Sequence, residues 1–109
     1  MLRPGDVVTV DFVDAIGTKR RPAVVVTTQL YHSPHPDVVL AGPTTQLTAA
    51  STPTDHVLQD WFRAGLHSPS AFRAYLGTYA ASSVTASGHL SDRDWQAVQT
   101  RLTAAIALN

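Results

Sequence analysis

The sequence predicts a mainly β fold, a small and highly curved antiparallel sheet or barrel that one C-terminal helix closes on one side. Short segments rich in β-branched residues are separated by turns that contain Gly or Pro, and an amphipathic helical pattern occurs only near the end of the chain. The 109 residues are enough for one domain and too few for two. We therefore expect a single domain over residues 1–109, with the strands first and the helix last.

The first two strands are predicted by different patterns. Over residues 7–13, apolar and polar side chains alternate, which is typical of a half-buried strand. Residues 14–19 contain Gly17 and are expected to form a loop. Residues 22–28 are almost continuously apolar or β-branched, which predicts a central strand covered on both faces.

The middle of the chain gives weaker patterns. Residues 31–37 contain two prolines and are expected to be a loop, and residues 37–45 a third strand that Pro43 restricts to an edge or bulge near its end. The remaining expectations are a surface loop over 47–54, a short strand over 56–58, a turn over 64–66, a strand over 71–79 and a connection over 83–88.

The C-terminal helix is the clearest element. Ser91 is a good N-cap, and Asp92 and Asp94 fall in the first turn, where the helix dipole favours negative charge. Leu90 and Trp95 have the spacing of a hydrophobic staple. The apolar side chains that share one helical face are Trp95, Val98, Leu102 and Ile106.

Composition excludes several kinds of chemistry. Eight basic and eight acidic residues cancel, which argues against broad, non-specific binding of nucleic acid. Every acidic residue is Asp, so no glutamate general base exists, and the absence of cysteine excludes disulfides and thiolate zinc sites. No apolar run approaches the length of a membrane span, and the N-terminus lacks the apolar region of a signal peptide. We therefore expect a cytoplasmic protein without a membrane partner.

Polar side chains gather at the ends of two predicted strands. Arg20 and Arg21 come directly before the apolar run at residues 22–28, and Thr44 and Thr45 follow the third strand. A fixed guanidinium beside a fixed hydroxyl suits a phosphodiester that is being cleaved. From the residues alone, a solvated basic cluster and a strand-end threonine pair are the better interpretations.

The chain resembles the MazF/PemK toxins of bacterial type II toxin–antitoxin systems. Five short pieces occur in that family's order and span nearly the whole chain. They are Gly5-Asp6-Val7-Val8 with Val10-Asp11-Phe12, Arg21-Pro22-Ala23-Val24-Val25-Val26, Pro43-Thr44-Thr45-Gln46, Gly65-Leu66 with Ser70, and Gly88-His89-Leu90-Ser91.

The resemblance implies a MazF/CcdB-like, SH3-like barrel that forms a homodimer. It implies a sequence-selective endoribonuclease toxin that cleaves single-stranded RNA without a metal or other cofactor and that a cognate antitoxin inhibits. The family's catalytic arginine maps onto Arg21. Its catalytic threonine maps onto Thr44, or onto Thr45 if the more common Pro-x-Thr spacing is the anchor; we prefer Thr44 because no gap is then needed.

Cleavage without metal uses the ribose 2′-hydroxyl as nucleophile and leaves 2′,3′-cyclic phosphate and 5′-hydroxyl ends. We assign Arg21 to charge stabilisation, because a guanidinium loses its proton only above about pH 12 and is a poor acid or base. Lys19, Arg20 and Gln46 are candidate substrate-binding residues beside it. The first loop is shorter than in many relatives, and residues 70–76 lack the family's usual Asp-Gln dipeptide, so the base preference does not carry over.

Other polar and aromatic residues are weaker candidates. His32 and His35 have the spacing of two metal ligands, but no further motif completes a site, and a loop pair is the better interpretation. As general bases near neutral pH, the candidates are His56, His67 and His89. As base-stacking groups or core residues, the candidates are Trp61 and Phe62 with Arg63, and Phe72, Tyr75 and Tyr79.

Two non-catalytic alternatives remain. The gyrase-poisoning CcdB toxins share the implied fold and act on a protein target, but they depend on a Trp near the C-terminus, where this chain ends Ile106-Ala107-Leu108-Asn109. A degenerate relative that only binds a partner is the other alternative.

Overall fold

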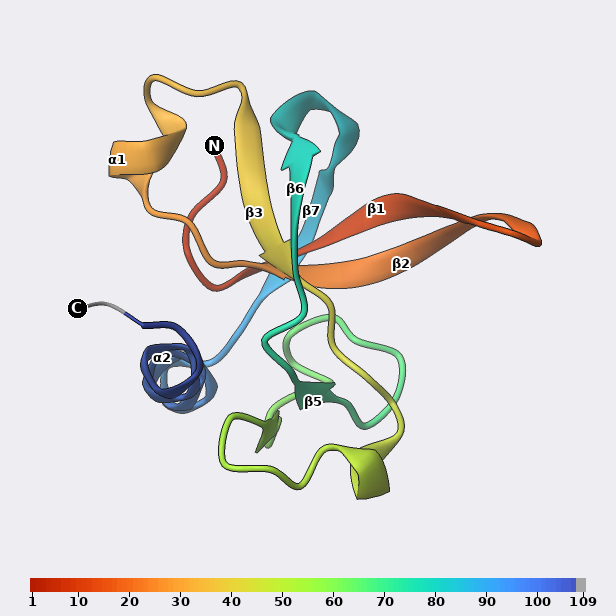
Figure 1. Ribbon diagram of the computed structural model, residues 1–109, viewed down its shortest axis with the longest axis vertical. Coiled ribbons are helices and arrows are strands. Elements are labelled where there is room, and N and C mark those ends of the chain that lie inside the picture. Colours follow the sequence, from red (N-terminus) through yellow and green to blue (C-terminus); the bar gives the residue numbers. More distant parts are fainter. Residues whose placement is uncertain (108–109) are drawn as a thin grey trace.

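The computed structural model describes residues 1–107, and its main element is a strongly twisted antiparallel sheet (Figure 1). The sheet has five strands in the order β6-β3-β2-β1-β7, and β4 and β5 form a second, two-stranded sheet. The strands are β1 (Asp6–Asp14), β2 (Gly17–Val25), β3 (Asp37–Ala41), β4 (His56–Val57), β5 (Ala71–Phe72), β6 (Leu76–Ala80) and β7 (Thr85–His89). The helices are α1 (Gln29–His32) and α2 (Asp92–Ala105), with 3₁₀ turns η1 (Leu47–Ala49) and η2 (Ala81–Ser83).

The predicted fold class, a mainly β antiparallel sheet with a C-terminal helix, is confirmed. Within the described residues the edge strands β6 and β7 do not pair with each other, so the curved sheet is open and does not close into a barrel.

The β1–β2 hairpin is longer than the sequence pattern suggests and projects from the rest of the molecule (Figure 1). Its pairs run from Val7↔Val24 to Asp14↔Gly17, so only residues 15 and 16 connect the two strands. The expectation of a loop over residues 14–19 is therefore wrong at residue 14, where β1 ends, and at residues 17–19, where β2 begins. Residues 17–19 are exposed and carry no apolar alternation, but backbone pairing does not require it.

Three further expectations need correction. The segment 71–79 is two strands in different sheets, and β3 ends at Ala41, so residues 42–45 are not part of it. Residues 83–88 were expected to be a connection, but most of them form β7, which pairs with β1. The side chains of β7 are small or polar and show no apolar alternation, so the sequence pattern did not predict this strand. Gly88 has a specific reason to lack a side chain, because a Cβ there would lie 2.0 Å from the Ala64 carbonyl oxygen.

Alternate residues of β1 and β2 enter two different apolar clusters. Val7 and Val24 pack with Phe72, Leu90 and Val98 between the large sheet, the small sheet and α2. On the other face of the large sheet, the buried cluster consists of Val8, Val10, Ala23, Val25, Val38 and Leu40. The prediction that the apolar run of the second strand is covered on both faces is thus correct for residues 23–25.

Helix α2 begins as predicted. The Ser91 hydroxyl accepts a hydrogen bond from the Asp94 amide at 3.4 Å, and Leu90, Trp95, Val98 and Leu102 belong to the first cluster. Ile106 follows the helix and is 38% exposed, so the apolar face that packs on the core ends at Leu102 and does not include Ile106.

Asp94 joins helix α2 to the segment around β4. Its carboxylate is buried and accepts hydrogen bonds from the Gln59 and Asp60 amides at 3.0 and 2.8 Å, and it lies 2.9 Å from Nε2 of His56. Burial alone would raise the pKa of Asp94, but the hydrogen bonds from Gln59, His56 and Asp60 outweigh it and lower the pKa. The ionised carboxylate is therefore the form that the fold stabilises.

Replacing Asp94 with Ala is expected to destabilise the protein by about 3 kcal/mol, because two buried amides and His56 lose their partner. Because the pKa of Asp94 is lower in the folded protein, the carboxylate stabilises the fold fully above about pH 5 and loses this effect as the pH falls below about 4. Denaturant unfolding of both proteins at pH 7 and pH 3 measures the difference. Asp92→Ala, an exposed neighbour in the same turn, is the control; an equal effect of both substitutions would contradict the role of Asp94.

Candidate active site

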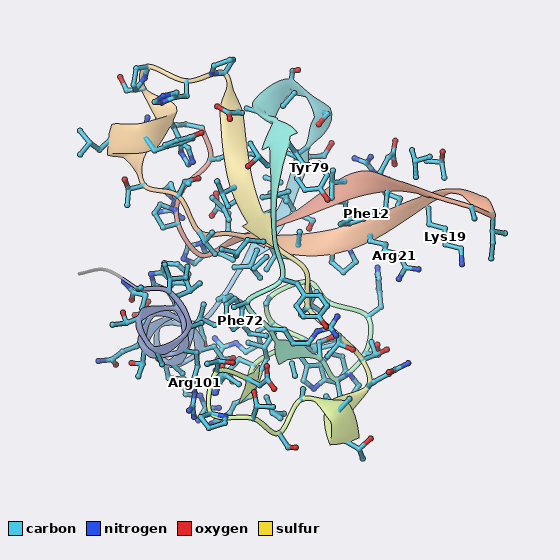
Figure 2. All side chains as sticks on the ribbon, viewed as in Figure 1. Phe12, Lys19, Arg21, Phe72, Tyr79 and Arg101 are labelled. Carbon is cyan, nitrogen blue, oxygen red and sulfur yellow. The ribbon has the colours of Figure 1, made fainter. Side chains whose placement is uncertain are left out.

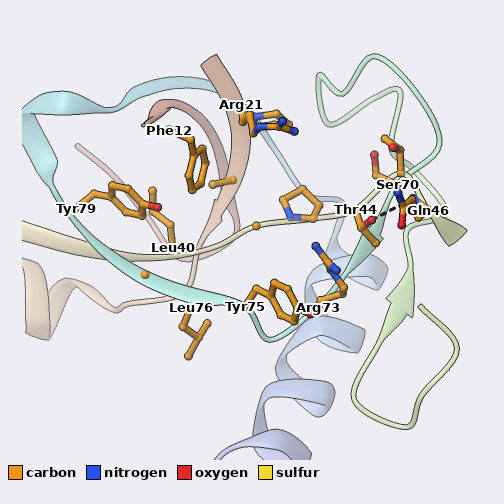
Figure 3. Close-up of a pocket in the computed structure, with 16 residues that line it drawn as sticks. Phe12, Arg21, Leu40, Thr44, Gln46, Ser70, Arg73, Tyr75, Leu76 and Tyr79 are labelled. Atoms are coloured by element: carbon orange, nitrogen blue, oxygen red, sulfur yellow. Dashed lines mark hydrogen bonds between the residues drawn. The ribbon is translucent and has the colours of Figure 1, made fainter. Parts of the chain in front are cut away.

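A cavity of about 610 Å³ opens where the large sheet meets the segments around β5 (Figure 3). It is bordered by β2, by the connection that follows β3 and by the connection between β5 and β6. The polar lining residues are Arg21, Thr44, Thr45, Gln46, Ser70 and Arg73; the aromatic and larger aliphatic ones are Phe12, Leu40, Tyr75, Leu76 and Tyr79.

The charge of this cavity is entirely positive. Among the described residues that line it are two arginines and no aspartate, lysine or histidine. Among the side chains that the structure describes, none forms a hydrogen bond or an ion pair with the guanidinium of Arg21 or Arg73. Arg73 is partly buried, where an arginine normally finds a carboxylate or another acceptor, and Arg21 is exposed at the edge of the same cavity. Two guanidinium groups without a counter-charge in one cavity favour an anion there.

The acidic side chains are engaged elsewhere. Asp60 accepts two hydrogen bonds from Arg93 at 2.7 and 2.8 Å, and these bonds, with one from Ser91, strongly lower the pKa of Asp60. Asp11 pairs with Arg20 at 3.0 Å, and Asp94 with His56. These carboxylates are thus held away from the cavity and leave its positive charge uncompensated.

Arg21 is placed by the register of β2. It pairs with Val10, and its side chain lies on the face of the sheet that also carries Phe12. The next residues of the strand, Ala23–Val25, are fully buried, which fixes the backbone from which Arg21 extends. Figure 2 shows Arg21 and Lys19 extending from β2 on the same side.

Thr44 is placed by a β-bridge. Its amide donates to the Ala71 carbonyl at 2.9 Å, and its carbonyl accepts from the Ala71 amide at 2.8 Å. The Thr44 hydroxyl accepts a hydrogen bond from the Gln46 amide at 3.1 Å, as the dashed line in Figure 3 shows. The threonine therefore caps a local turn, and its hydroxyl proton is still available to a ligand. Thr45 also lines the cavity and is more exposed.

The predicted binding residues separate into two groups. Gln46 lines the cavity with Arg21 and the two threonines. Lys19 shares a face of β2 with Arg21 but lies beyond the cavity lining. Arg20 lies on the opposite face, where it donates to Asp11 at 3.0 Å and to the Thr85 hydroxyl at 2.9 Å.

Arg73 was missed by sequence reasoning. It follows the buried strand β5, and its guanidinium carbon lies 3.9 Å from the centre of the Tyr75 ring. The sequence feature that could have identified it is the position of an arginine between two aromatic residues, Phe72 and Tyr75, in a segment interpreted as one continuous strand. Of those aromatics, Phe72 is fully buried in the core, whereas Tyr75 and Tyr79 line the cavity.

The histidines do not reach the cavity. His56 and His89 lie against Asp94 and Asp6 at 2.9 and 2.7 Å, and His67 is an exposed residue outside the lining. His32 contacts the Thr27 hydroxyl, and His35 stacks on Tyr31 with ring centres 4.3 Å apart. Within the described part of the chain, no cluster of three or more histidine and aspartate side chains has the arrangement of a metal site.

The other aromatic candidates lie outside the cavity. Trp61 packs against the first core cluster, and Phe62 is 77% exposed with its ring edge against Trp61. The helices within residues 1–107 are too short or too polar to cross a membrane.

Comparison with solved structures shows the same fold at low sequence identity. An endoribonuclease in complex with its cognate antitoxin, from mycobacterial species, matches with a TM-score of 0.81 and 19% identity over 100% of this chain and 98% of that chain. A MazE–MazF structure from Deinococcus radiodurans matches with a TM-score of 0.75 and 17% identity over 95% and 94% of the two chains. Among curated proteins, none matches this chain.

The sequence itself identifies the family. The family model described as the PemK-like, MazF-like toxin of type II toxin–antitoxin systems matches residues 3–106, which is nearly the whole chain. The resemblance noted from five short motifs is thereby confirmed. This chain belongs to the PemK-like, MazF-like toxins of type II toxin–antitoxin systems, a family of endoribonucleases.

Proposed function

We propose that this protein is a metal-independent endoribonuclease toxin that cleaves single-stranded RNA at the cavity bordered by Arg21 and Thr44. The observation that carries this proposal is the pair of unpaired guanidinium groups in a cavity whose described lining holds no acidic side chain. Such a cavity favours a polyanion, and the neutral overall charge of the chain confines that preference to one site.

The chemistry follows from what the lining residues can and cannot do. The 2′-oxygen forms a bond to the adjacent phosphorus, the bond from phosphorus to the 5′-oxygen breaks, and the 2′-proton leaves while the 5′-oxygen gains one. Arg21 would stabilise the charge that develops on the phosphoryl oxygens, and the Thr44 hydroxyl would donate to one of them. Histidine and carboxylate are absent from the described lining, so water would carry the protons.

The partners follow from the family and from its solved members. We propose that a cognate antitoxin inhibits the toxin, because one of the matching structures is an endoribonuclease bound to its antitoxin. We also propose that the chain forms a homodimer and acts in the cytoplasm, where its RNA substrate is found. An acidic or apolar antitoxin segment would suit the cavity. Acidic side chains of the segment would complement the two arginines, and apolar ones would pack on the aromatic and aliphatic lining residues of the cavity.

Replacing Arg21 with Ala is expected to lower the cleavage rate by about 1,000-fold, because the charge that develops on the phosphate loses its main partner. A mixed-sequence single-stranded RNA is cleaved in excess EDTA, and the product ends are identified by mass spectrometry. Arg20→Ala is the matched control, because its neighbouring side chain points to the other face and pairs with Asp11; its rate is expected to stay within about 3-fold of the wild-type rate.

Three outcomes would contradict the proposal. Ends other than a 2′,3′-cyclic phosphate would exclude the 2′-hydroxyl mechanism, and equal effects of the two arginine substitutions would exclude Arg21 as the special group. No cleavage by folded wild-type protein would leave a toxin that acts by binding a partner, and growth arrest would then survive Arg21→Ala.

Thr44→Val is expected to lower the cleavage rate by about 30-fold, while Thr45→Val changes it by less than about 3-fold. The reason is that the β-bridge to Ala71 fixes the position of Thr44, and a lost hydrogen bond to a charged oxygen costs about 2 kcal/mol. Both variants keep the shape of the side chain, so stability measured by thermal unfolding serves as the control. A larger loss for Thr45→Val would assign the catalytic role to Thr45.

The cleavage rate is expected to rise steadily between about pH 5.5 and 8.5, without the break near about pH 6.5 that a histidine general base produces. The reason is that no histidine lies among the described lining residues, so hydroxide or water must remove the 2′-proton. The measurement is the single-turnover rate at saturating enzyme across this range. A plateau in this profile that disappears in His67→Ala would contradict this expectation and show that a histidine outside the described lining serves as the base.

A further inference from the structure

We propose that Arg73 and Tyr75 form a nucleobase subsite beside the cleavage site, which accepts a base that carries a carbonyl oxygen and disfavours adenine. This inference rests on the proposed function, because it names the part of the RNA that enters the second half of the same cavity.

The cavity has two chemically different halves. One half is polar and contains Thr44, Gln46 and Ser70; the other contains Phe12, Leu40 and Tyr79 (Figure 3). Phe12 and Tyr79 meet edge to face with ring centres 5.6 Å apart, so the second half has a rigid aromatic wall. A phosphate loses its hydration at such a wall without compensation, whereas a flat, weakly hydrated base is suited to it.

Arg73 lies between the two halves with its hydrogen-bonding capacity unused. Its Nε is buried and has no partner within the described residues. A buried donor without an acceptor is unfavourable, and a ligand that supplies an acceptor removes this unfavourable state. In Figure 3 the guanidinium nitrogens of Arg73 point into the cavity, away from Leu76.

Tyr75 supplies a stacking surface next to these donors. One face of its ring carries the Arg73 guanidinium at 3.9 Å, yet 66% of the residue is exposed. The backbone is held in place, because the Tyr75 carbonyl accepts a hydrogen bond from the Gly42 amide at 3.0 Å. A fixed and exposed tyrosine ring paired with an arginine is the kind of platform on which unpaired bases stack.

The chemistry of arginine selects the base. A guanidinium offers only donors, so it requires acceptor atoms on the base. Guanine offers O6 and N7 as an adjacent pair that matches the arginine fork, and uracil and cytosine each offer a carbonyl oxygen. Adenine has no carbonyl group, and its exocyclic amino group turns a donor toward the guanidinium. The subsite should therefore discriminate against adenine, with guanine as its best occupant.

The subsite can be tested without any cleavage. A random heptamer pool made with 2′-fluoro nucleotides lacks the attacking hydroxyl, and the sequences that the protein retains are read by sequencing. For wild-type protein we expect adenine to be depleted about 10-fold at one position, which is within the discrimination of one good arginine–base contact. Arg73→Ala should reduce that depletion to less than about 2-fold and leave the preferences at other positions unchanged.

Two further variants complete the design. Tyr75→Leu keeps an apolar side chain and should weaken retention of the pool about 10-fold, because one stacked base is lost. Arg63→Ala removes an exposed arginine outside the cavity lining and should change neither the retention nor the adenine frequency. Circular dichroism and thermal unfolding of each variant establish that the fold is retained.

Two kinds of result would overturn the subsite. If Arg73→Ala weakens retention of all sequences equally, Arg73 contacts the phosphate backbone and reads no base. If wild-type protein retains the pool without adenine depletion, or does not retain it, the cavity has no such subsite. Selective retention by a wild-type protein that does not cleave RNA would refute the proposed function alone, and cleavage without base selection would refute the subsite alone.

Discussion

The antiparallel ladder between β1 and β2 determines which face of the sheet carries Arg21. Its register places Arg21 opposite Val10 and Arg20 opposite Asp11. A slip of one residue would exchange the two arginines between the faces, and it would also expose the valines that fill the two apolar clusters. The free-energy cost of exposing both clusters therefore keeps Arg21, an exposed residue, on its face of the sheet. Burial of Ala23–Val25 on both sides makes this register the stable one.

The distribution of acidic side chains has a functional consequence. Asp94 and Asp60 connect helix α2 to the segment before β5, and Asp6 lies against His89 at the end of β7. Each of these carboxylates is satisfied within the fold and stabilises it. Because they are used there, a chain with no net charge still has an uncompensated positive cavity. Stability and the electrostatics of the candidate site thus depend on the same pairing of charges.

The sequence predicted the parts of this protein in which side-chain pattern and structure coincide. The alternation over residues 7–13, the apolar run over residues 22–28 and the cap at Ser91 identified β1, the buried part of β2 and α2. It did not predict β7, because Ser, Thr, Ala and Gly side chains carry no periodicity and backbone pairing with β1 alone defines the strand.

The candidate site was predicted in part for a similar reason. Arg21, Thr44, Thr45 and Gln46 line one cavity, and their roles there stay predictions. Arg20 does not, because adjacent residues of a strand point to opposite faces. Arg73 was missed, because its importance comes from the chain crossing between the two sheets after β5, and this crossing brings residues distant in sequence beside Arg21 and Thr44. No local sequence pattern predicts such a crossing.

The most direct test of this account is NMR of the arginine side chains during titration with a 2′-deoxy dinucleotide, which binds without being cleaved. We expect the Nε–Hε signals of Arg21 and Arg73 to shift, because these two guanidinium groups are unpaired among the described residues and line the cavity. The signals of Arg20 and Arg93, which are already paired with Asp11 and Asp60, should remain in place. Shifts at Arg20 or Arg93, with none at Arg21, would contradict the claim that this cavity is the anion site.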